Sequence, residues 1–307
     1  TEQKRSLESL QDTRLTMEPS SFIHVLLLCL VNVISTIAGI VLNSVVIISL
    51  RRSSQLRKKL CYLIILPLSC FDLAVVTIGH PVLIMRTILW YMDKYEEESK
   101  LMKCIIVIVC NLTAYSMSAL LTLSVERFLA LKYPFFHQTG VTKSRLVIIW
   151  TFLVVITLSL FSLHLFDGNI VDNVAVIACI LSFLLLFMYL NYNIMMIAKS
   201  KLKSQSVSIA HDREEAKRRI ANLKQVSTCS MAVGCFFICS FLILVSSVLQ
   251  LTGDTLLNGR PSQIFRIWSC TLFVMNSTCN CLIFFWKNTI LRREGIKTVK
   301  CYWSARS

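Results

Sequence analysis

The chain has 307 residues, of which 55% are hydrophobic and 16% charged, and its mean hydropathy is +0.66. A soluble domain is usually about one quarter charged, so this composition excludes a disordered chain and disfavours a soluble enzyme. The 8 glycines and 5 prolines exclude a collagen-like or loop-rich architecture. A net charge of +15 could indicate a nucleic-acid partner, but the positions of the charges argue against one.

Seven stretches are long and apolar enough to cross a bilayer core of roughly 30 Å, which takes about 20 helical residues. Six of them carry no charge, and one carries a single Asp. Lipid cannot satisfy backbone polar groups, so each stretch is expected to be a helix. In chain order they are Phe22–Leu50, Leu60–Met85, Ile105–Val125, Leu146–Phe166, Val174–Ala198, Val226–Leu251 and Ile267–Trp286.

We therefore predict an all-α membrane protein whose seven helices form one bundle. The predicted organisation is an extracellular tail over residues 1–20, the bundle over 21–286, and a short amphipathic eighth helix with a cytoplasmic tail over 287–307. Within the connection between the fifth and sixth spans, the charged stretch Asp212–Arg219 is predicted to extend the sixth helix.

The loop charges indicate how the bundle is oriented. With the N-terminus outside, the inner segments carry 23 of the 32 Lys and Arg residues and have a net charge of +18, whereas the outer segments have a net charge of −2. Positive charge collects on the cytoplasmic side of membrane proteins, so we predict the N-terminus outside and the C-terminus inside. The basic excess then faces the cytoplasmic leaflet and its proteins, and no nucleic-acid partner is needed to explain it.

Asp72 is the single formal charge well inside a span. An intramembrane carboxylate is costly and usually faces polar partners in the bundle interior. Two interpretations remain open: a carboxyl held neutral by hydrogen bonds, or a site for a proton or a hard monovalent cation. Polar residues near the middle of other spans could surround it, namely Asn43, Ser116, Asn276, Ser277 and Asn280.

Arg127 closes the third span at its inner end, next to Glu126. The arginine could simply extend to the lipid headgroups. Alternatively, Glu126 could hold its guanidinium by a charge-assisted hydrogen bond, and such a pair at a cytoplasmic mouth can act as a latch between two bundle states.

Taken together, motifs on all seven spans resemble those of rhodopsin-like (class A) G-protein-coupled receptors over nearly all of Phe22–Trp303. Glu126-Arg127-Phe128 is similar to the family's Asp-Arg-Tyr motif. Asn276-Ser-x-x-Asn280-Cys-x-x-Phe284 is similar to its Asn-Ser-x-x-Asn-Pro-x-x-Tyr motif. The other matching positions are Asn43, Leu68 to Asp72, Trp150, Tyr192, Phe236, Cys239 and the run Asn288–Glu294, which resembles the eighth helix.

The resemblance implies roles for these residues and partners for the chain. It implies an allosteric sodium pocket at Asp72, Ser116, Asn276 and Asn280, with Asn43 nearby. It implies that Glu126, Arg127, Phe128, Tyr192 and Phe284 form the switch that couples to a heterotrimeric G protein at the plasma membrane. Juxtamembrane Cys301 is a candidate for palmitoylation or an unmodified thiol.

The chain also departs from the family pattern. Ser240 and Leu242 replace the tryptophan and proline of the sixth helix, and Cys281 and Phe284 replace the proline and tyrosine of the seventh. The prolines that usually kink the sixth and seventh helices are therefore missing. A short second outer loop and the Tyr192 region resemble the melanocortin and cannabinoid branch of the family.

The sequence indicates the family more firmly than the chemical class of the ligand. Val109 stands where amine receptors have an aspartate, which makes a peptide or a lipid a better candidate than a monoamine. By helix position, the outer ligand-binding residues would be Val109, Asn111, Thr113 and Ser240. The acidic outer run over residues 93–98 could attract a cationic peptide or be a solvated loop.

Two other function classes stay open. A receptor-fold protein that does not couple to G proteins, such as a heterodimer partner, would fit the altered sixth and seventh helices. An ion-coupled transporter would fit Asp72, but no internal repeat is visible and proline is scarce. No nucleophile–base constellation, phosphate loop or metal-type His/Cys spacing indicates an enzyme.

Overall fold

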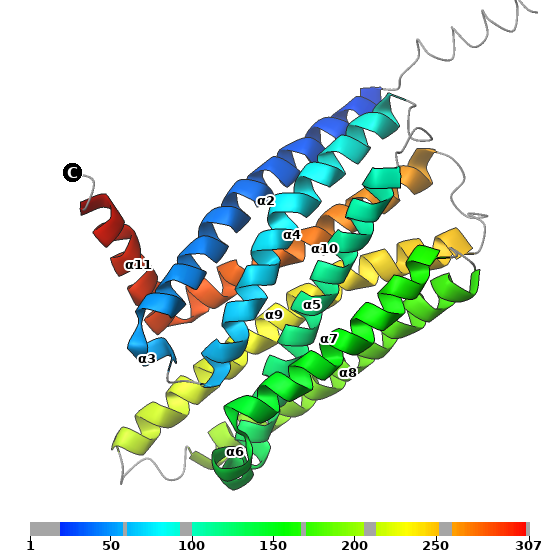
Figure 1. Ribbon diagram of the computed structural model, residues 1–307. Coiled ribbons are helices and arrows are strands. Elements are labelled where there is room, and N and C mark those ends of the chain that lie inside the picture. The colour runs from blue at the N-terminus through cyan, green and yellow to red at the C-terminus, as the bar shows by residue number, and fades with distance from the viewer. Residues whose placement is uncertain are drawn as a thin grey trace, which may run out of the picture.

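A computed structural model describes residues 19–57, 60–92, 100–166, 170–205, 213–251 and 260–304. All regular structure in these residues is helical. Seven long helices lie side by side along one direction (Figure 1). They are α2 (Pro19–Arg52), α4 (Leu60–Tyr91), α5 (Lys100–Lys132), α7 (Lys143–Phe166), α8 (Ile170–Gln205), α9 (Arg213–Leu251) and α10 (Arg260–Lys287).

Each of the seven predicted spans lies within one of these helices, which confirms the seven-helix bundle. Six helices of the described chain are long and apolar enough to cross a membrane on their own. The remaining one, α7, meets the same test when it is taken with the short α6 (Pro134–Gly140), from which it turns by 93°. The predicted extension of the sixth helix is confirmed from Arg213 onward, where α9 begins; Asp212 lies outside the described residues.

Helix ends agree with the predicted orientation. Basic side chains occupy the last turns of α2, α5 and α10, namely Arg51 and Arg52, Lys132 and Lys287. Positive charge at a helix C-terminus opposes the negative end of the helix dipole. These three ends belong to the face that we predict to be cytoplasmic, and we call it the inner end of the bundle.

Three short helices complete this inner end. α3 (Ser54–Arg57) follows α2, and α6 begins with Pro134 in its first turn, where a proline costs no helix hydrogen bond. α11 (Thr289–Ser304) turns away from α10 at the inner end (Figure 1). It is longer than the predicted eighth-helix run, which ended at Glu294.

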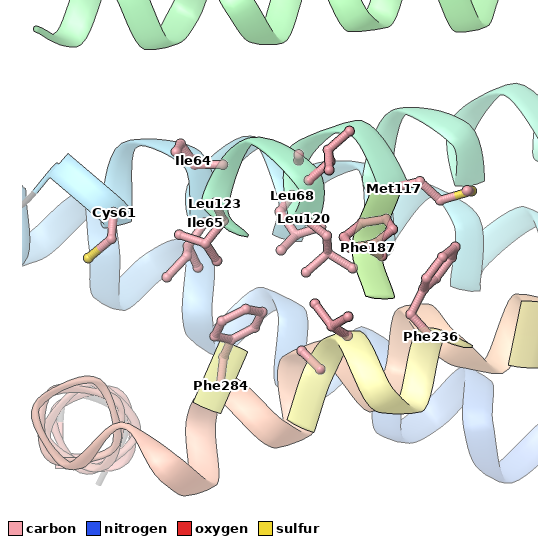
Figure 2. Packing of buried hydrophobic residues seen from close by; sticks show 14 of the residues in the cluster. Cys61, Ile64, Ile65, Leu68, Met117, Leu120, Leu123, Phe187, Phe236 and Phe284 are labelled. Carbon is pink, nitrogen blue, oxygen red and sulfur yellow. The ribbon is translucent and has the colours of Figure 1, made fainter. Parts of the chain in front are cut away.

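Apolar side chains divide between the bundle interior and its outer surface. In the inner half, α4, α5, α8, α9 and α10 contribute buried residues to one cluster (Figure 2). At its centre the rings of Phe187 and Phe236, both fully buried, lie 5.3 Å apart. Other large apolar residues remain exposed on the outside of the bundle, such as Ile37, Phe152 and Leu185, as expected for helices surrounded by lipid.

α2 approaches α4 and α10 closely at one glycine. A Cβ atom added at Gly39 would lie 2.7 Å from Cγ1 of Val76 and 2.8 Å from Oγ1 of Thr278. The Thr278 hydroxyl donates to the carbonyl of Ser35 at 3.0 Å, one turn earlier on α2. Only a residue without a side chain allows this approach, which brings α2 against the two helices that carry Asp72 and Asn280.

Candidate functional site: a buried polar core and a charged inner latch

Asp72 lies in the centre of the bundle and is fully buried on α4. The Ser116 hydroxyl on α5 donates to its Oδ1 at 2.7 Å, and the Asn280 amide on α10 donates to its Oδ2 at 3.3 Å. Ser277, also on α10, lies next to the same carboxyl. Three helices thus meet at one acid. Their hydrogen bonds offset part of the free-energy cost of burying the carboxyl.

Several acceptor oxygens around this acid have no hydrogen-bond partner within the described chain. They include Oδ1 of Asn280 and Oγ of Ser277, both on buried side chains. Oδ1 of Asn276, which is buried one turn earlier on α10, also has no partner within the described residues, and no contact joins Asn276 to Asp72 there. Buried polar atoms are almost always paired, with water or ions where protein groups are missing. A carboxyl with neighbouring amide and hydroxyl oxygens is a donor set that suits a hard cation.

Asn43 is placed differently from the other members of the predicted sodium pocket. It is fully buried on α2, and its amide donates to the carbonyl of Gly39 at 3.0 Å. Its Oδ1 has no partner within the described residues. Asn43 therefore secures the turn that contains the close-packed glycine.

The inner end of α5 carries a buried charged cluster. Oε2 of Glu126 lies 2.6 Å from Nε of Arg127, and Oε1 lies 2.8 Å from Nε2 of His137 on α6. The Glu126 side chain is 1% exposed and that of Arg127 is 10% exposed. An ionised carboxylate only accepts hydrogen bonds, so His137 donates to it. Glu126 therefore links the third transmembrane helix to the inner connection that follows it.

Sequence reasoning did not single out His137. The sequence signal that could have indicated it is Pro134, which favours the start of a new helix. One turn of that helix then brings position 137 back to α5. Phe128 occupies the third position of the predicted switch. It packs between the main core and a second cluster of Leu131 and Ile194, which joins α5 to α8.

The structure does not bring Tyr192 into this cluster. Its side chain on α8 is 65% exposed and lies in a run with the exposed Tyr189 and Met196. The helical register turns position 192 outward, so its predicted place in the switch is not supported. Phe284, in contrast, is buried in the inner core and contributes ring contacts where the family has a tyrosine hydroxyl.

Tyr62 on α4 provides a tyrosine hydroxyl at the inner end of the bundle, where α10 carries Phe284. Nδ2 of Asn288 donates to the hydroxyl of buried Tyr62 at 2.7 Å. Oδ1 of the same asparagine accepts from the backbone amide of Leu291 at 3.2 Å, in the first turn of α11. One side chain therefore joins the inner end of α4 to the start of α11.

The predicted ligand residues are all buried. Val109 packs with Val75, Leu83 and Val274 in a layer that joins α5 to α4 and α10. The side chains of Asn111 and Thr113 donate to carbonyls one turn earlier on their own helix. Ser240 on α9 is fully buried, and its hydroxyl has no partner within the described residues.

A polar network in the same region was not anticipated. It joins α2, α4 and α10 through Asn32, His80 and Thr271, each fully buried. The amide of Asn32 donates to the Thr271 hydroxyl at 3.2 Å, and its Oδ1 accepts from Nδ1 of His80 at 2.7 Å. The network adds hydrogen bonds between the helices that also surround Gly39.

Two arginines extend into the outer part of the bundle. Arg86 on α4 and Arg266 on α10 are both half-buried. Both lie within electrostatic range of the half-buried thiol of Cys270 on α10, and Arg86 lies within range of Cys110 on α5 as well. Two positive charges therefore lie toward the outer ends of α4 and α10.

Cys301 lies near the end of α11 and is exposed. The helix also carries an exposed pair, in which Nζ of Lys297 lies 2.8 Å from Oε1 of Glu294. This hydrogen bond lowers the pKa of the Glu294 carboxyl from its ordinary value. Exposed Ile296 and Val299 alternate with these charges, as expected for a helix lying at a membrane surface.

The arrangement defines a class of protein: a seven-helix membrane bundle with a polar core and a buried charged cluster at one end. The sequence pattern of the family described as 7 transmembrane receptor (rhodopsin family) matches residues 42–284. The chain belongs to this family of rhodopsin-like G-protein-coupled receptors, and it is a multi-pass membrane protein. The resemblance to the melanocortin and cannabinoid branch stays a prediction.

Proposed function

We propose that the protein is a plasma-membrane receptor that binds an extracellular ligand and activates a heterotrimeric G protein through outward movement of α9. Members of this family act in general through such ligands and G proteins, and they are in general not enzymes. The observation that carries the proposal is the buried Glu126–Arg127 pair at the inner end, held from a second side by His137.

The proposed mechanism is a shift between two states of the bundle. A ligand that prefers the open state increases its population by the difference in its affinity for the two states. When α9 moves out, Arg127 leaves Glu126 and becomes available to a docking G protein. Because linkage is reciprocal, G-protein binding tightens agonist binding by the same factor.

The ligand we propose carries an anionic group, as a lipid or a peptide carboxylate does. Arg86 on α4 and Arg266 on α10 are half-buried toward the outer ends of their helices. Guanidinium groups bind carboxylate and phosphate oxygens with strong, directed hydrogen bonds. Their positive field opposes a monoamine at the same place, in agreement with valine at position 109.

Basal activation of the four Gα classes in cells tests the coupling. We expect wild-type activity in at least one class, and a loss of most of that activity in Arg127→Ala at equal surface expression. Arg57→Ala removes an exposed charge from the same end of the bundle and should stay near wild type. An Arg127→Ala variant that signals like the wild type would contradict the proposed role. Silence of all three proteins, also with anionic lipids added, would favour an uncoupled heterodimer partner.

We also propose that sodium binds beside Asp72, with Ser116, Asn276 and Asn280 as further ligands. When sodium is at about ten times its dissociation constant, binding should stabilise the folded protein by about 1.4 kcal/mol. We expect a higher melting temperature in sodium chloride than in potassium chloride at equal ionic strength, and no difference in Asp72→Asn. Thr87→Val, which changes a buried hydroxyl bonded within α4, should keep the sodium effect. Equal melting of the wild type in both salts would rule out this site.

A further inference from the structure

One face of α11 is held against the inner ends of α2 and α10. Leu291 on this face is fully buried. A Cβ atom added at Gly295, one turn later, would lie 3.1 Å from Cγ1 of Val45 on α2 and 2.6 Å from Cε2 of Phe285 on α10. Residues four apart share one side of a helix. The position of α11 beside the bundle is therefore fixed, and its remaining sides are left to lipid headgroups and cytoplasm.

A second face of α11 carries a basic stripe, which consists of Arg293, Lys297 and Lys300. All three side chains are exposed. Their spacings of four and three residues place them on one side of the helix, within about 10 Å along its axis. Exposed Ile296 and Val299 form the neighbouring apolar strip. A helix with adjacent apolar and basic strips lies in the membrane interface, where its basic side chains reach lipid phosphates.

The end of α10 places the start of α11 at the level of this interface. Trp286 is 63% exposed, and Nζ of Lys287 lies 5.9 Å from the centre of its ring. Tryptophan collects where the membrane meets water. Nη1 of Arg292, on the first turn of α11, donates to the carbonyl of Trp286 at 3.0 Å. The basic stripe therefore begins at the level of the headgroups.

Contacts within the protein leave most of the positive charge of the basic stripe uncompensated. Glu294 is the single acid of α11, and its Oε1 lies 2.8 Å from Nζ of Lys297. Within the part of the chain that the structure describes, no hydrogen bond or ion pair engages Arg293 or Lys300. The neighbouring helices α2, α3 and α10 contain no acidic residue. The stripe is therefore open to an anionic partner.

From this arrangement we propose that the basic stripe binds the headgroup of a phosphoinositide, a lipid of the cytoplasmic leaflet whose inositol ring carries additional phosphates. Basic residues on an amphipathic helix attract such lipids. A headgroup with several phosphates can contact Arg293 and Lys300 together, and a guanidinium binds phosphate through two parallel hydrogen bonds. Phosphatidylserine lacks the further phosphates. α11 and α6 lie at different corners of the inner end (Figure 1), so this binding does not depend on the latch at Glu126.

Glu294 limits the affinity of the basic stripe. Its carboxylate pairs with Lys297 and adds negative charge next to the headgroup. Glu294→Gln removes this charge and leaves the Lys297 ammonium to the phosphates, so binding is expected to become tighter. Neutral replacements in the stripe are expected to weaken binding, by about fivefold for each charge near the membrane surface. Variants of one helix should thus respond in opposite directions.

The test uses the full-length receptor in nanodiscs of phosphatidylcholine, titrated with a fluorescent short-chain phosphatidylinositol bisphosphate. We expect this lipid to bind at least about tenfold more tightly than short-chain phosphatidylserine. Arg293→Gln and Lys300→Gln should each weaken binding about fivefold, and Glu294→Gln should strengthen it. Lys143→Gln removes an exposed charge at the start of α7, also at the inner end, and should bind like the wild type. Equal melting temperatures show that the variants are folded.

Unchanged binding in a double variant, Arg293→Gln with Lys300→Gln, would overturn the proposal. Equal affinity for the bisphosphate and for phosphatidylserine would also overturn it, because attraction to any anionic lipid would then suffice. Free inositol trisphosphate separates a lipid from a soluble phosphate. We expect it to bind more weakly than the lipid, whose acyl chains add contacts at Ile296 and Val299. A free headgroup that binds as tightly as the lipid would contradict the assignment to a lipid.

Discussion

Replacing Gly39 with alanine is expected to destabilise the folded receptor, although alanine is the better helix former. The added Cβ would meet Val76 and Thr278 at distances that real Cβ atoms do not adopt. Forcing atoms into a packed interior costs about 1–3 kcal/mol. α2 must therefore shift away from α4 and α10, which weakens the contacts that close the polar core.

Gly234→Ala is the matched control for this substitution. It makes the same chemical change within α9, at a position where the new Cβ meets nothing within 4 Å. Here the helix propensity of alanine should stabilise the protein by up to about 1 kcal/mol. Melting of the solubilised protein and its surface expression measure both variants. Equal melting temperatures for the two variants would contradict the close packing at Gly39.

Replacing Glu126 with glutamine is expected to raise basal G-protein activation strongly. The carboxylate forms an ion pair with Arg127 and a hydrogen bond with His137, and a hydrogen bond to a charged group contributes about 1.5–3 kcal/mol. Glutamine keeps the volume but loses the charge. If the lost free energy belongs to the inactive state alone, the open state gains at least about tenfold in relative population.

Two further variants separate the parts of this latch. His137→Gln removes the link to α6 but leaves the Glu126–Arg127 pair, so a smaller rise is expected. Glu294→Gln removes an exposed carboxylate that pairs with Lys297 on α11, and it should signal like the wild type. All variants are compared at equal surface levels in the Gα class that the wild type activates. Unchanged basal output in Glu126→Gln would show that the pair does not restrain the inactive state.

The bundle was predictable because the membrane imposes a simple rule. A helix that crosses lipid must be long and apolar, and this pattern is visible in each of the seven spans. The Glu126–Arg127 pair was also within reach of sequence reasoning, since neighbours in a chain stay close. The meeting of Asp72 with Ser116 and Asn280 depended on the family motifs, because periodicity alone does not fix which helices are neighbours.

Other features depended on rotation and packing that no single span reveals. Tyr192 lies on the exposed side of α8. Within its membrane span, apolar residues surround the helix on every side, so the sequence did not show which side faces the bundle. His137 contacts Glu126 because α6 begins at Pro134 and returns position 137 to the end of α5.

Asn288 gives the inner end of the receptor an unusual energetic dependence. Its amide nitrogen donates a hydrogen bond to Tyr62 on α4, while its amide oxygen accepts one from the first turn of α11. Replacing Asn288 removes both contacts, whereas replacing Tyr62 removes only one of them. Single replacements of Tyr62 and Asn288 should therefore be non-additive. The asparagine variant should include most of the loss seen in the tyrosine variant, and it should also weaken the first turn of α11.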